Sequence, residues 1–202
     1  MNKEIINILE LLNARGEAFV QNVISTFSCS NNEVNQFLKE RSIEFAKRRT
    51  AITYFYMNEN GVLLGYFTIL FKPFIVKKGV LPTSFESNLK SFRYKEDADN
   101  YAISGYLLAQ LGKNENLSDP IHGDELLDTA LNVILDAMNN FGNKIVWLEC
   151  ESDNDKALRL YTSDKFGFRQ FGERYDEDKN GNTIKYIMML KLYKSNQLNQ
   201  LL

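Results

Sequence analysis

The stretch DPIHGDELL, residues 119–127, places a glycine and the chain's only histidine at the start of an acidic and apolar run that is typical of a helix. The first amides of a helix lack acceptors within it and carry a partial positive charge, which suits a bound phosphate. Gly123 has no Cβ, so a phosphate oxygen could approach its backbone closely. Asp124 and Glu125 suit the helix dipole but would repel an anion. The sequence therefore permits two interpretations, an ordinary helix start or a cradle for the pyrophosphate of a cofactor.

The composition limits the class of protein. A chain of 202 residues with 44% hydrophobic and 25% charged residues is sized for one globular domain. The formal charge of −2 argues against a nucleic-acid partner, although a local basic patch is compatible with it. Cys29 and Cys150 are too few for a disulfide framework and indicate reduced thiols in a cytoplasmic protein. With one histidine and no apolar run that could span a bilayer, we expect neither a metal site nor a membrane partner.

Hydrophobic periodicity gives the elements that must position any site. Residues 4–14 have a helical period, and so do residues 30–49, with a break near Ser42. The second of these stretches opens with Ser30 and Glu33, which have the spacing of a capping box. The sequence therefore predicts two helical segments before the first strand.

The next segments predict the start of a sheet. Residues 50–57 and 62–71 are rich in β-branched and aromatic side chains and flank a turn signal, which predicts an antiparallel hairpin. Residues 72–100 contain two prolines and several lysines. We interpret them as an irregular insertion that lies over the sheet.

The central part of the chain predicts the fold class. Strands 101–112 and 144–150 are largely apolar, and 122–140 between them is an amphipathic helix. This order gives parallel neighbours with a right-handed crossover, and ligands bind at the carboxyl ends of such strands. A short helix in 153–168 and a final hairpin around residues 179–182 complete one α/β domain with a mixed sheet. The apolar helix face comprises Leu127, Ala130, Leu131, Ile134, Met138 and Phe141, and Gly142 ends the helix.

Two motifs follow one another within this strand pattern. Leu111, Gly112 and Lys113 end a strand, and Gly123 with Leu126-Leu127 starts the helix. The second motif consists of Leu148, Glu149, Cys150, Asn154, Ala157 and Tyr161. Together they resemble the GNAT superfamily of acetyl-coenzyme A-dependent N-acetyltransferases. The motifs cover residues 108–168, and the order of elements extends the resemblance to about 30–192.

The chain departs from the family's pattern at two places. Ser118 and Ile121 occupy loop positions where the family has Gln or Arg and a first glycine, so Gly123 is the loop glycine that remains. The turn between Tyr161 and Gly167 is two residues longer than the family's usual turn. The resemblance thus implies a less open cradle and a lengthened turn after the tyrosine.

The resemblance implies a single GNAT-like domain over residues 1–202, with a mostly antiparallel sheet flanked by helices. A central parallel pair of strands would splay apart to hold acetyl-coenzyme A as co-substrate, and holding amine and thioester together can supply roughly 7–11 kcal/mol. The implied cofactor contacts are Leu111, Gly112, Lys113, Ile121, His122, Gly123, Asp124 and Asn154.

The resemblance also implies two residues for proton transfer. Tyr161 would protonate the leaving thiolate, because a phenol with an ordinary pKa of about 10 keeps its proton at neutral pH. Glu149 would take the proton of the amine, with Glu151 as the reserve candidate. Cys150 is interpreted as a small buried hydrophobic residue, since no histidine lies near it in the sequence.

We therefore expect an N-acetyltransferase that moves an acetyl group from acetyl-coenzyme A directly to a primary amine of a small molecule, peptide or protein. The first alternative is a toxin or anti-defence acetyltransferase that acts on charged tRNA or on a protein, with Lys47, Arg48, Arg49 and the lysines of 72–95 as a basic patch. The second is a degenerate domain that binds acetyl-coenzyme A without catalysis. The sequence allows a homodimer, and no motif identifies the acceptor.

Overall fold

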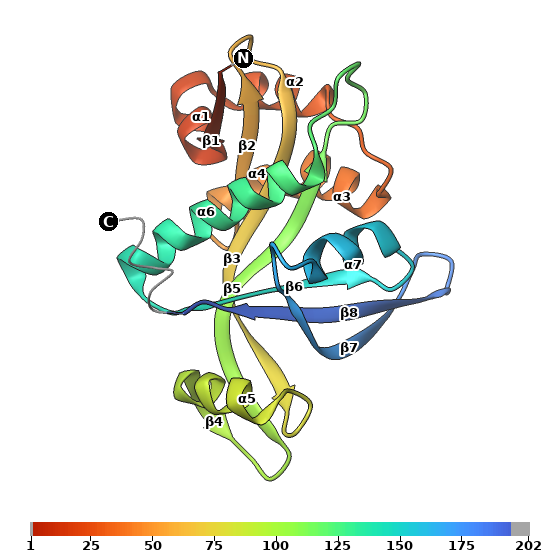
Figure 1. Cartoon of the computed structure of the whole chain (residues 1–202). Helices are drawn as coiled ribbons and strands as arrows, with labels where there is room; N and C mark the ends of the chain where they lie inside the picture. The colour runs from red at the N-terminus through yellow and green to blue at the C-terminus, as the bar shows by residue number, and fades with distance from the viewer. Residues whose placement is uncertain (1, 195–202) are drawn as a thin grey trace. The chain divides into compact units, whose positions relative to one another are not determined.

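The computed structural model describes residues 2–194 (Figure 1). These residues form two compact units. The first unit comprises residues 2–70 and 108–133, and the second comprises residues 71–107 and 134–194. The strands are β1 (Lys3–Asn7), β2 (Ile52–Asn58), β3 (Leu63–Lys77), β4 (Arg93–Glu96), β5 (Asn100–Lys113), β6 (Ile145–Glu151), β7 (Arg169–Glu177) and β8 (Thr183–Leu192). The helices are α1 (Ile8–Arg15), α2 (Glu17–Ser25), α3 (Asn32–Gln36), α4 (Ser42–Lys47), α5 (Thr83–Leu89), α6 (Gly123–Phe141) and α7 (Asp155–Thr162), with single turns η1 (Phe37–Arg41) and η2 (Lys90–Phe92).

The strands of the described residues belong to one mixed sheet. They pair in the order β1-β2-β3-β5-β6-β8-β7, and β4 pairs with β5. The sheet is mostly antiparallel, whereas β5 and β6 run parallel, with Tyr106 opposite Val146 and Leu107 opposite Trp147. The predicted α/β class, the two hairpins and the parallel strand pair are confirmed.

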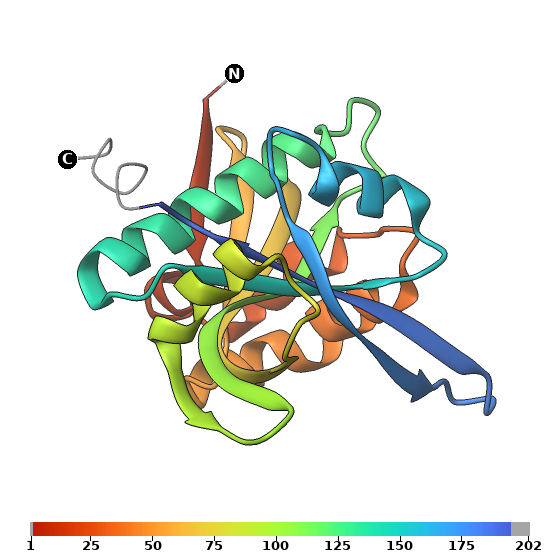
Figure 2. The same ribbon diagram turned by 60° about the horizontal axis from the view of Figure 1, so that its bottom comes forward.

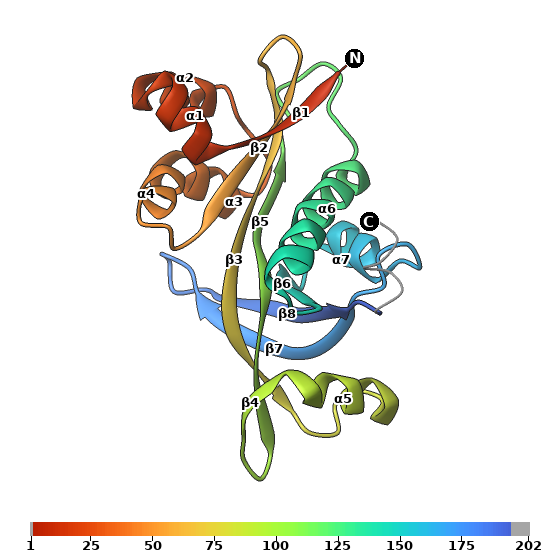
Figure 3. The same cartoon turned by 90° about the vertical axis from the view of Figure 1, so that its left-hand side faces the viewer.

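In the first unit, helices cover both faces of the strands. Figure 3 shows α1 to α4 on one face of β1, β2 and β3 and the start of α6 on the other. Tyr66 of β3 packs edge to face on Phe27, with ring centroids 5.1 Å apart. Its neighbour Gly65 faces the opposite layer, where an added Cβ would lie 3.0 Å from Leu126 and 3.2 Å from Ile121. Alternating residues of one strand therefore fix both layers.

Two expectations for the N-terminal part are wrong. Residues 3–7 form an edge strand paired with β2, and the helix begins only at Ile8, because the Asn7 side chain caps it by accepting from the Leu9 amide at 2.9 Å. The cap of α3 is Asn31 instead of Ser30. The expected break near Ser42 is confirmed, since η1 separates α3 from α4 there.

In the second unit, β8 pairs antiparallel with β6 and with β7, and the pairing with β7 shifts register between Gln170 and Gly172. Phe74, Trp147 and Phe171 pack against one another beside these strands, with ring centroids 5.0 and 5.2 Å apart along the row. The indole N–H of Trp147 is buried without an acceptor among the described residues. Aromatic packing thus forms the core on this face of β6.

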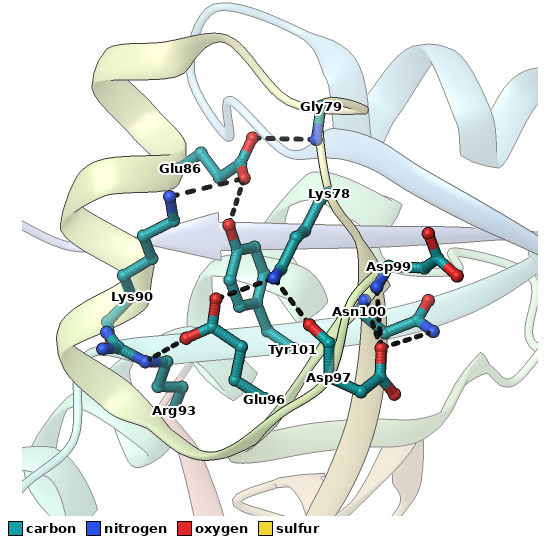
Figure 4. Close-up of polar contacts among 10 residues, drawn as sticks. All are labelled: Lys78, Gly79, Glu86, Lys90, Arg93, Glu96, Asp97, Asp99, Asn100 and Tyr101. Atoms are coloured by element: carbon teal, nitrogen blue, oxygen red, sulfur yellow. Dashed lines mark hydrogen bonds and ion pairs between the residues drawn. The ribbon is translucent and has the colours of Figure 1, made fainter.

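The expectation that residues 72–100 are irregular is wrong. β3 continues to Lys77, and α5, η2 and β4 follow before β5 begins. A polar network holds this segment (Figure 4): the buried Glu86 accepts from the Tyr101 hydroxyl at 2.6 Å and from the Gly79 amide at 3.1 Å, and Lys78 pairs with Glu96 at 2.8 Å. Paired charges therefore order a segment whose composition suggested a loop.

The predicted central helix is confirmed as α6. It ends at Gly142, which has φ +82° and donates its amide to Met138 at 2.8 Å, as a helix-terminating glycine does. The apolar face is predicted correctly except at its last position, since Phe141 is 86% exposed. No helix in the described part of the chain is both long and apolar enough to cross a bilayer.

Candidate active site

The loop that follows β5 is anchored in the first unit by Asn114. Its side chain is fully buried and donates to the carbonyls of Leu63 at 2.9 Å and Thr26 at 3.2 Å, while its oxygen accepts from the Ser28 amide at 3.2 Å. Its backbone amide bonds Leu64 at 2.8 Å. Because the donors and the acceptor of the buried Asn114 side chain are all bonded, this residue fixes the direction in which the loop leaves β5.

The end of β5 carries three of the predicted cofactor contacts. Gly112 is packed from the side, since an added Cβ would lie 2.5 Å from Val34 and 3.1 Å from Phe27. Close packing therefore accounts for this glycine without a ligand. Leu111 and Lys113, on either side of it, are half-buried and point to the other face of the strand.

The start of α6 holds the remaining predicted contacts of the first unit. The side chain of Ile121 is buried and fixes the loop against the sheet, whereas His122 and Asp124 are exposed. The Leu126 amide donates to the His122 carbonyl at 3.3 Å, which is the first bond of the helix. The amides before it lie at the positive end of the helix, where anions bind.

The side chain of Glu125, in the first turn of α6, is bonded to residues of β1 and β2. Its carboxylate accepts from the Tyr56 hydroxyl at 2.7 Å and forms an ion pair with Lys3. Burial opposes its charge, but the bonds from Lys3 and Tyr56 outweigh this and lower the pKa of Glu125. Burial and the bond to Glu125 in turn raise the pKa of Tyr56 to about 12. The charge of Glu125 is thus largely engaged by partners, which reduces its expected repulsion of a bound phosphate.

Tyr161 lies in α7 of the second unit and is 9% exposed. Its ring packs edge to face on Phe168 at 5.9 Å. Burial, and next the nearby Cys150, raise the pKa of Tyr161, so it stays protonated throughout the neutral range. No described residue hydrogen-bonds to its hydroxyl, and the hydroxyl oxygen is not fully shielded from solvent.

Glu149 of β6 is engaged by Arg174 of β7. Both Nε and Nη2 of Arg174 donate to the same oxygen, Glu149 Oε2, at 3.0 and 2.9 Å. Arg174 also bonds Asp176 at 2.8 Å and stacks over the Tyr186 ring at 4.4 Å. The guanidinium, itself partly desolvated, gains more from these carboxylates than it loses by burial, and its pKa is raised. The carboxylate must release Arg174 before its Oε2 can accept a proton.

The two faces of β6 separate the candidates for catalysis. Glu149 and Glu151 alternate with Leu148 and Cys150, so the glutamates point to one face and the cysteine to the other. Cys150 is 7% exposed, and burial raises its pKa to about 12, which confirms the small hydrophobic role. Cys150 also lies near enough to Tyr161 to add to the rise of its pKa.

Asn154 has a structural role that accounts for its presence in the motif. Its side chain caps α7 by accepting from the Ala157 amide at 3.1 Å. After α7 the chain makes the lengthened turn, in which Gly167 has φ +65° and donates its amide to Ser163 at 2.7 Å. The turn returns Phe168 to the Tyr161 carbonyl at 3.0 Å and so supports the ring of Tyr161.

The predicted site residues thus form two groups. The cofactor candidates 111–113 and 121–124 lie in the first unit, and Glu149, Asn154 and Tyr161 lie in the second. Sequence reasoning did not identify Asn114, Tyr56 or Arg174. No motif marks them, because each acts through a partner that is distant in the sequence.

Comparisons with known proteins establish the fold. No protein-family model matches the chain, and no curated protein matches it. Among solved structures, AtaT complexed with acetyl-methionyl-tRNAfMet is 19% identical over 99% of both chains, with a TM-score of 0.63. A tyrosine-to-phenylalanine mutant of KacT is 22% identical over the full length of both chains, with a TM-score of 0.64. AtaTR bound with acetyl-coenzyme A is 20% identical over 99% of this chain and 98% of that one, with a TM-score of 0.58.

These likenesses extend over essentially the whole chain. At this level of identity they show a shared fold, and the fold is the GNAT-like one that the sequence motifs predicted.

Proposed function

We propose that this protein transfers an acetyl group from acetyl-coenzyme A to a primary amine. The observation that carries the proposal is Tyr161, which is almost fully buried, keeps its proton at neutral pH and has a hydroxyl that no described residue bonds. Such a hydroxyl can donate to a group that a ligand brings. The GNAT-like fold and the acetyl-coenzyme A bound in the AtaTR structure support this assignment.

The residues of the first unit fit a phosphate-bearing cofactor. The helix start at Gly123 favours an anion, and the bonds of Glu125 to Tyr56 and Lys3 reduce the repulsion from its carboxylate. The bonds of Asn114 fix the start of the loop that leads to this helix. We assign the pyrophosphate to the amides of residues 119–124 and strand-like backbone contacts to Leu111 and Lys113. When bound, acetyl-coenzyme A supplies a thioester as the acyl donor.

The residues of the second unit would move the protons. Tyr161 would hold a proton at Oη for the departing sulfur, because its raised pKa keeps the phenol protonated at every pH near neutrality. Glu149 would accept a proton from the amine once a cationic acceptor has displaced Arg174 from its carboxylate. Glu151, on the same face of β6, is the reserve base.

The amine of a charged tRNA is the second candidate for the acceptor. The AtaT structure contains acetyl-methionyl-tRNAfMet, and the expectation against a nucleic-acid partner rested on net charge alone. Positive side chains are unevenly distributed along this chain, since five of them line one hollow of the second unit. Primary amines of peptides and small molecules are the other acceptors that we propose.

The proposal is tested by incubating the full chain with acetyl-coenzyme A and one acceptor at a time. The acceptors are small amines, N-terminal peptides and aminoacyl-tRNAs, and mass spectrometry detects the acetylated product. We expect one class to be acetylated by the natural chain and much more slowly by Tyr161→Phe. Saturable binding of acetyl-coenzyme A without turnover of any class would favour the degenerate binding domain.

A further inference from the structure

A hollow of about 570 Å³ lies in the second unit, at the start of β6. Its walls come from α5 and η2, from the turn after α7 and from the end of β8, and Figure 2 gives the view in which α5 lies beside β8. Lys144 lines it, five residues before Glu149, which is about 17 Å along a strand at roughly 3.3 Å per residue. The hollow is therefore separate from the carboxylates of β6 that the proposed function uses.

The segment 72–100, which the sequence suggested was an insertion, and the lengthened turn after Tyr161 meet at the hollow. The segment 72–100 contributes Phe85, Asn88, Ser91 and Phe92 to its wall. The lengthened turn contributes residues 164–167. Both segments are ordered: α5 by the Glu86 network, and the turn by the bond from the Gly167 amide to Ser163.

The hollow is strongly basic. Asp164 is the one carboxylate among the residues that line it, within the described part of the chain. The cations that line it are Lys144, Lys165, Arg169, Lys191 and Lys194. Five cationic side chains thus line one concave surface, in a protein whose net charge is −2.

Aromatic rings stand among these cations. Arg169 lies over the Phe85 ring at 5.4 Å, and Lys165 lies over the Phe166 ring at 4.9 Å. Lys191 lies over the ring of Tyr193 at 4.8 Å. Phe85 and Phe92 are partly exposed at the wall. The rings thus hold cations at the wall of the hollow.

We propose that this hollow binds nucleotides, either free or within a single-stranded nucleic acid. The cations would hold phosphate groups, and the rings of Phe85 and Phe92 would stack on a base. An acidic peptide shares the negative charge but lacks the planar base that the aromatic wall accommodates. The assignment does not depend on acetyl transfer, because it concerns other residues and is measured by binding alone.

The test uses the full chain and a fluorescent single-stranded oligoadenylate, with binding followed by anisotropy. Lys165→Gln with Arg169→Gln removes two exposed cations of the hollow, and Lys156→Gln with Lys179→Gln removes two exposed cations outside it. Both double variants therefore have the same net charge. We expect the first to weaken binding at least tenfold and the second to leave it within a factor of two.

Salt and competitor series identify how the probe is held. The slope of log affinity against log salt should fall by about 1.4 in the first double variant, as for two lost phosphate contacts on a single strand. Displacement of the probe by AMP would support a free nucleotide as the ligand, and displacement only by unlabelled oligonucleotide would support a strand. Unchanged acetyl-coenzyme A affinity in that variant would show that the fold and the proposed cofactor site are intact.

Three results would overturn the proposal. The first is equal weakening in both double variants, which would reduce the effect to net charge. The second is displacement of the probe by polyglutamate at the same concentration of charge as oligoadenylate. The third is a loss of acetyl-coenzyme A affinity in Lys165→Gln with Arg169→Gln, which would assign the hollow to the cofactor.

Discussion

Arg174 places two hydrogen bonds on one oxygen of Glu149, Nε at 3.0 Å and Nη2 at 2.9 Å. The pair is partly exposed, with 24% of the Glu149 side chain and 38% of the Arg174 side chain accessible. A cationic acceptor can therefore reach the carboxylate and compete with Arg174. The proposed base is ion-paired with a partner that the acceptor can replace.

Glu149→Gln should lower kcat by about 10²–10⁴-fold and remove the acidic limb of the pH–rate profile, because an amide cannot accept the proton of the amine. A mainly raised KM would instead assign Glu149 to binding a cationic acceptor. The control is Glu177→Gln, which removes an exposed carboxylate of β7 and should leave both parameters unchanged. A loss confined to Glu151→Gln would transfer the role to the reserve candidate.

Tyr161→Phe should lower kcat by about 10²–10⁴-fold with nearly unchanged cofactor affinity, since the ring still packs on Phe168. Because burial raises the pKa of Tyr161, deprotonation of this group should not limit the rate below about pH 10. Tyr175→Phe, at a tyrosine that is 61% exposed, is the matched control. A Tyr161→Phe enzyme as fast as the natural one, with chemistry shown to be rate-limiting, would leave the acid assignment without support.

Asn114→Ala should reduce the free energy of unfolding by about 2–3 kcal/mol, because the buried carbonyls of Leu63 and Thr26 lose their donors. Urea denaturation measures the change. Asn140→Ala, at an exposed asparagine in the last turn of α6, should be neutral or slightly stabilising. Equal effects of the two changes would contradict the anchoring role of Asn114.

Tyr101→Phe tests the network around Glu86 through its pH dependence. The hydroxyl of Tyr101 is the main cause of the lowered pKa of Glu86, with the Gly79 amide and Lys90 adding to it. A lowered pKa stabilises the fold above the unfolded value, near 4.5, and that contribution is lost as the pH falls through the folded value. Tyr101→Phe should therefore cost about 1.5–3 kcal/mol at pH 7 and less in acid.

Denaturation curves at about pH 7 and pH 3 measure the difference for Tyr101→Phe. Tyr94→Phe is the control, since Tyr94 is 62% exposed. A destabilisation by Tyr101→Phe that is the same at both pH values would show that the bond to Glu86 does not carry the effect.

The elements that the sequence predicts well are those with strong local signals. The amphipathic period of α6 and the apolar run of β5 specify their own structure, and Gly142 marks the helix end. β1 was missed because residues 3–7 become a strand only through pairing with β2, about fifty residues away in the sequence. Long-range pairing here overrides a local helical period.

The candidate site is predictable only in its motif residues. Tyr161, Glu149 and Gly123 follow from the spacing that resembles the GNAT superfamily. Arg174 reaches Glu149 through the register of β7 on β8 and of β8 on β6, which no local pattern encodes. Likewise, α5 is held by the bond between Glu86 and Tyr101 of β5, fifteen residues later, so its composition alone suggested an irregular segment.

Calorimetric titration of the full chain with acetyl-coenzyme A, beside Gly123→Val, tests the central claim most directly. We predict saturable low-micromolar binding by the natural chain and at least tenfold weaker binding by the variant, about 1.4 kcal/mol, because a branched side chain obstructs the approach of a phosphate to the helix start. Thr83→Val, at the first residue of α5, is the control and should bind normally. Absence of binding by the natural chain, or unchanged affinity in a folded Gly123→Val protein, would contradict the account.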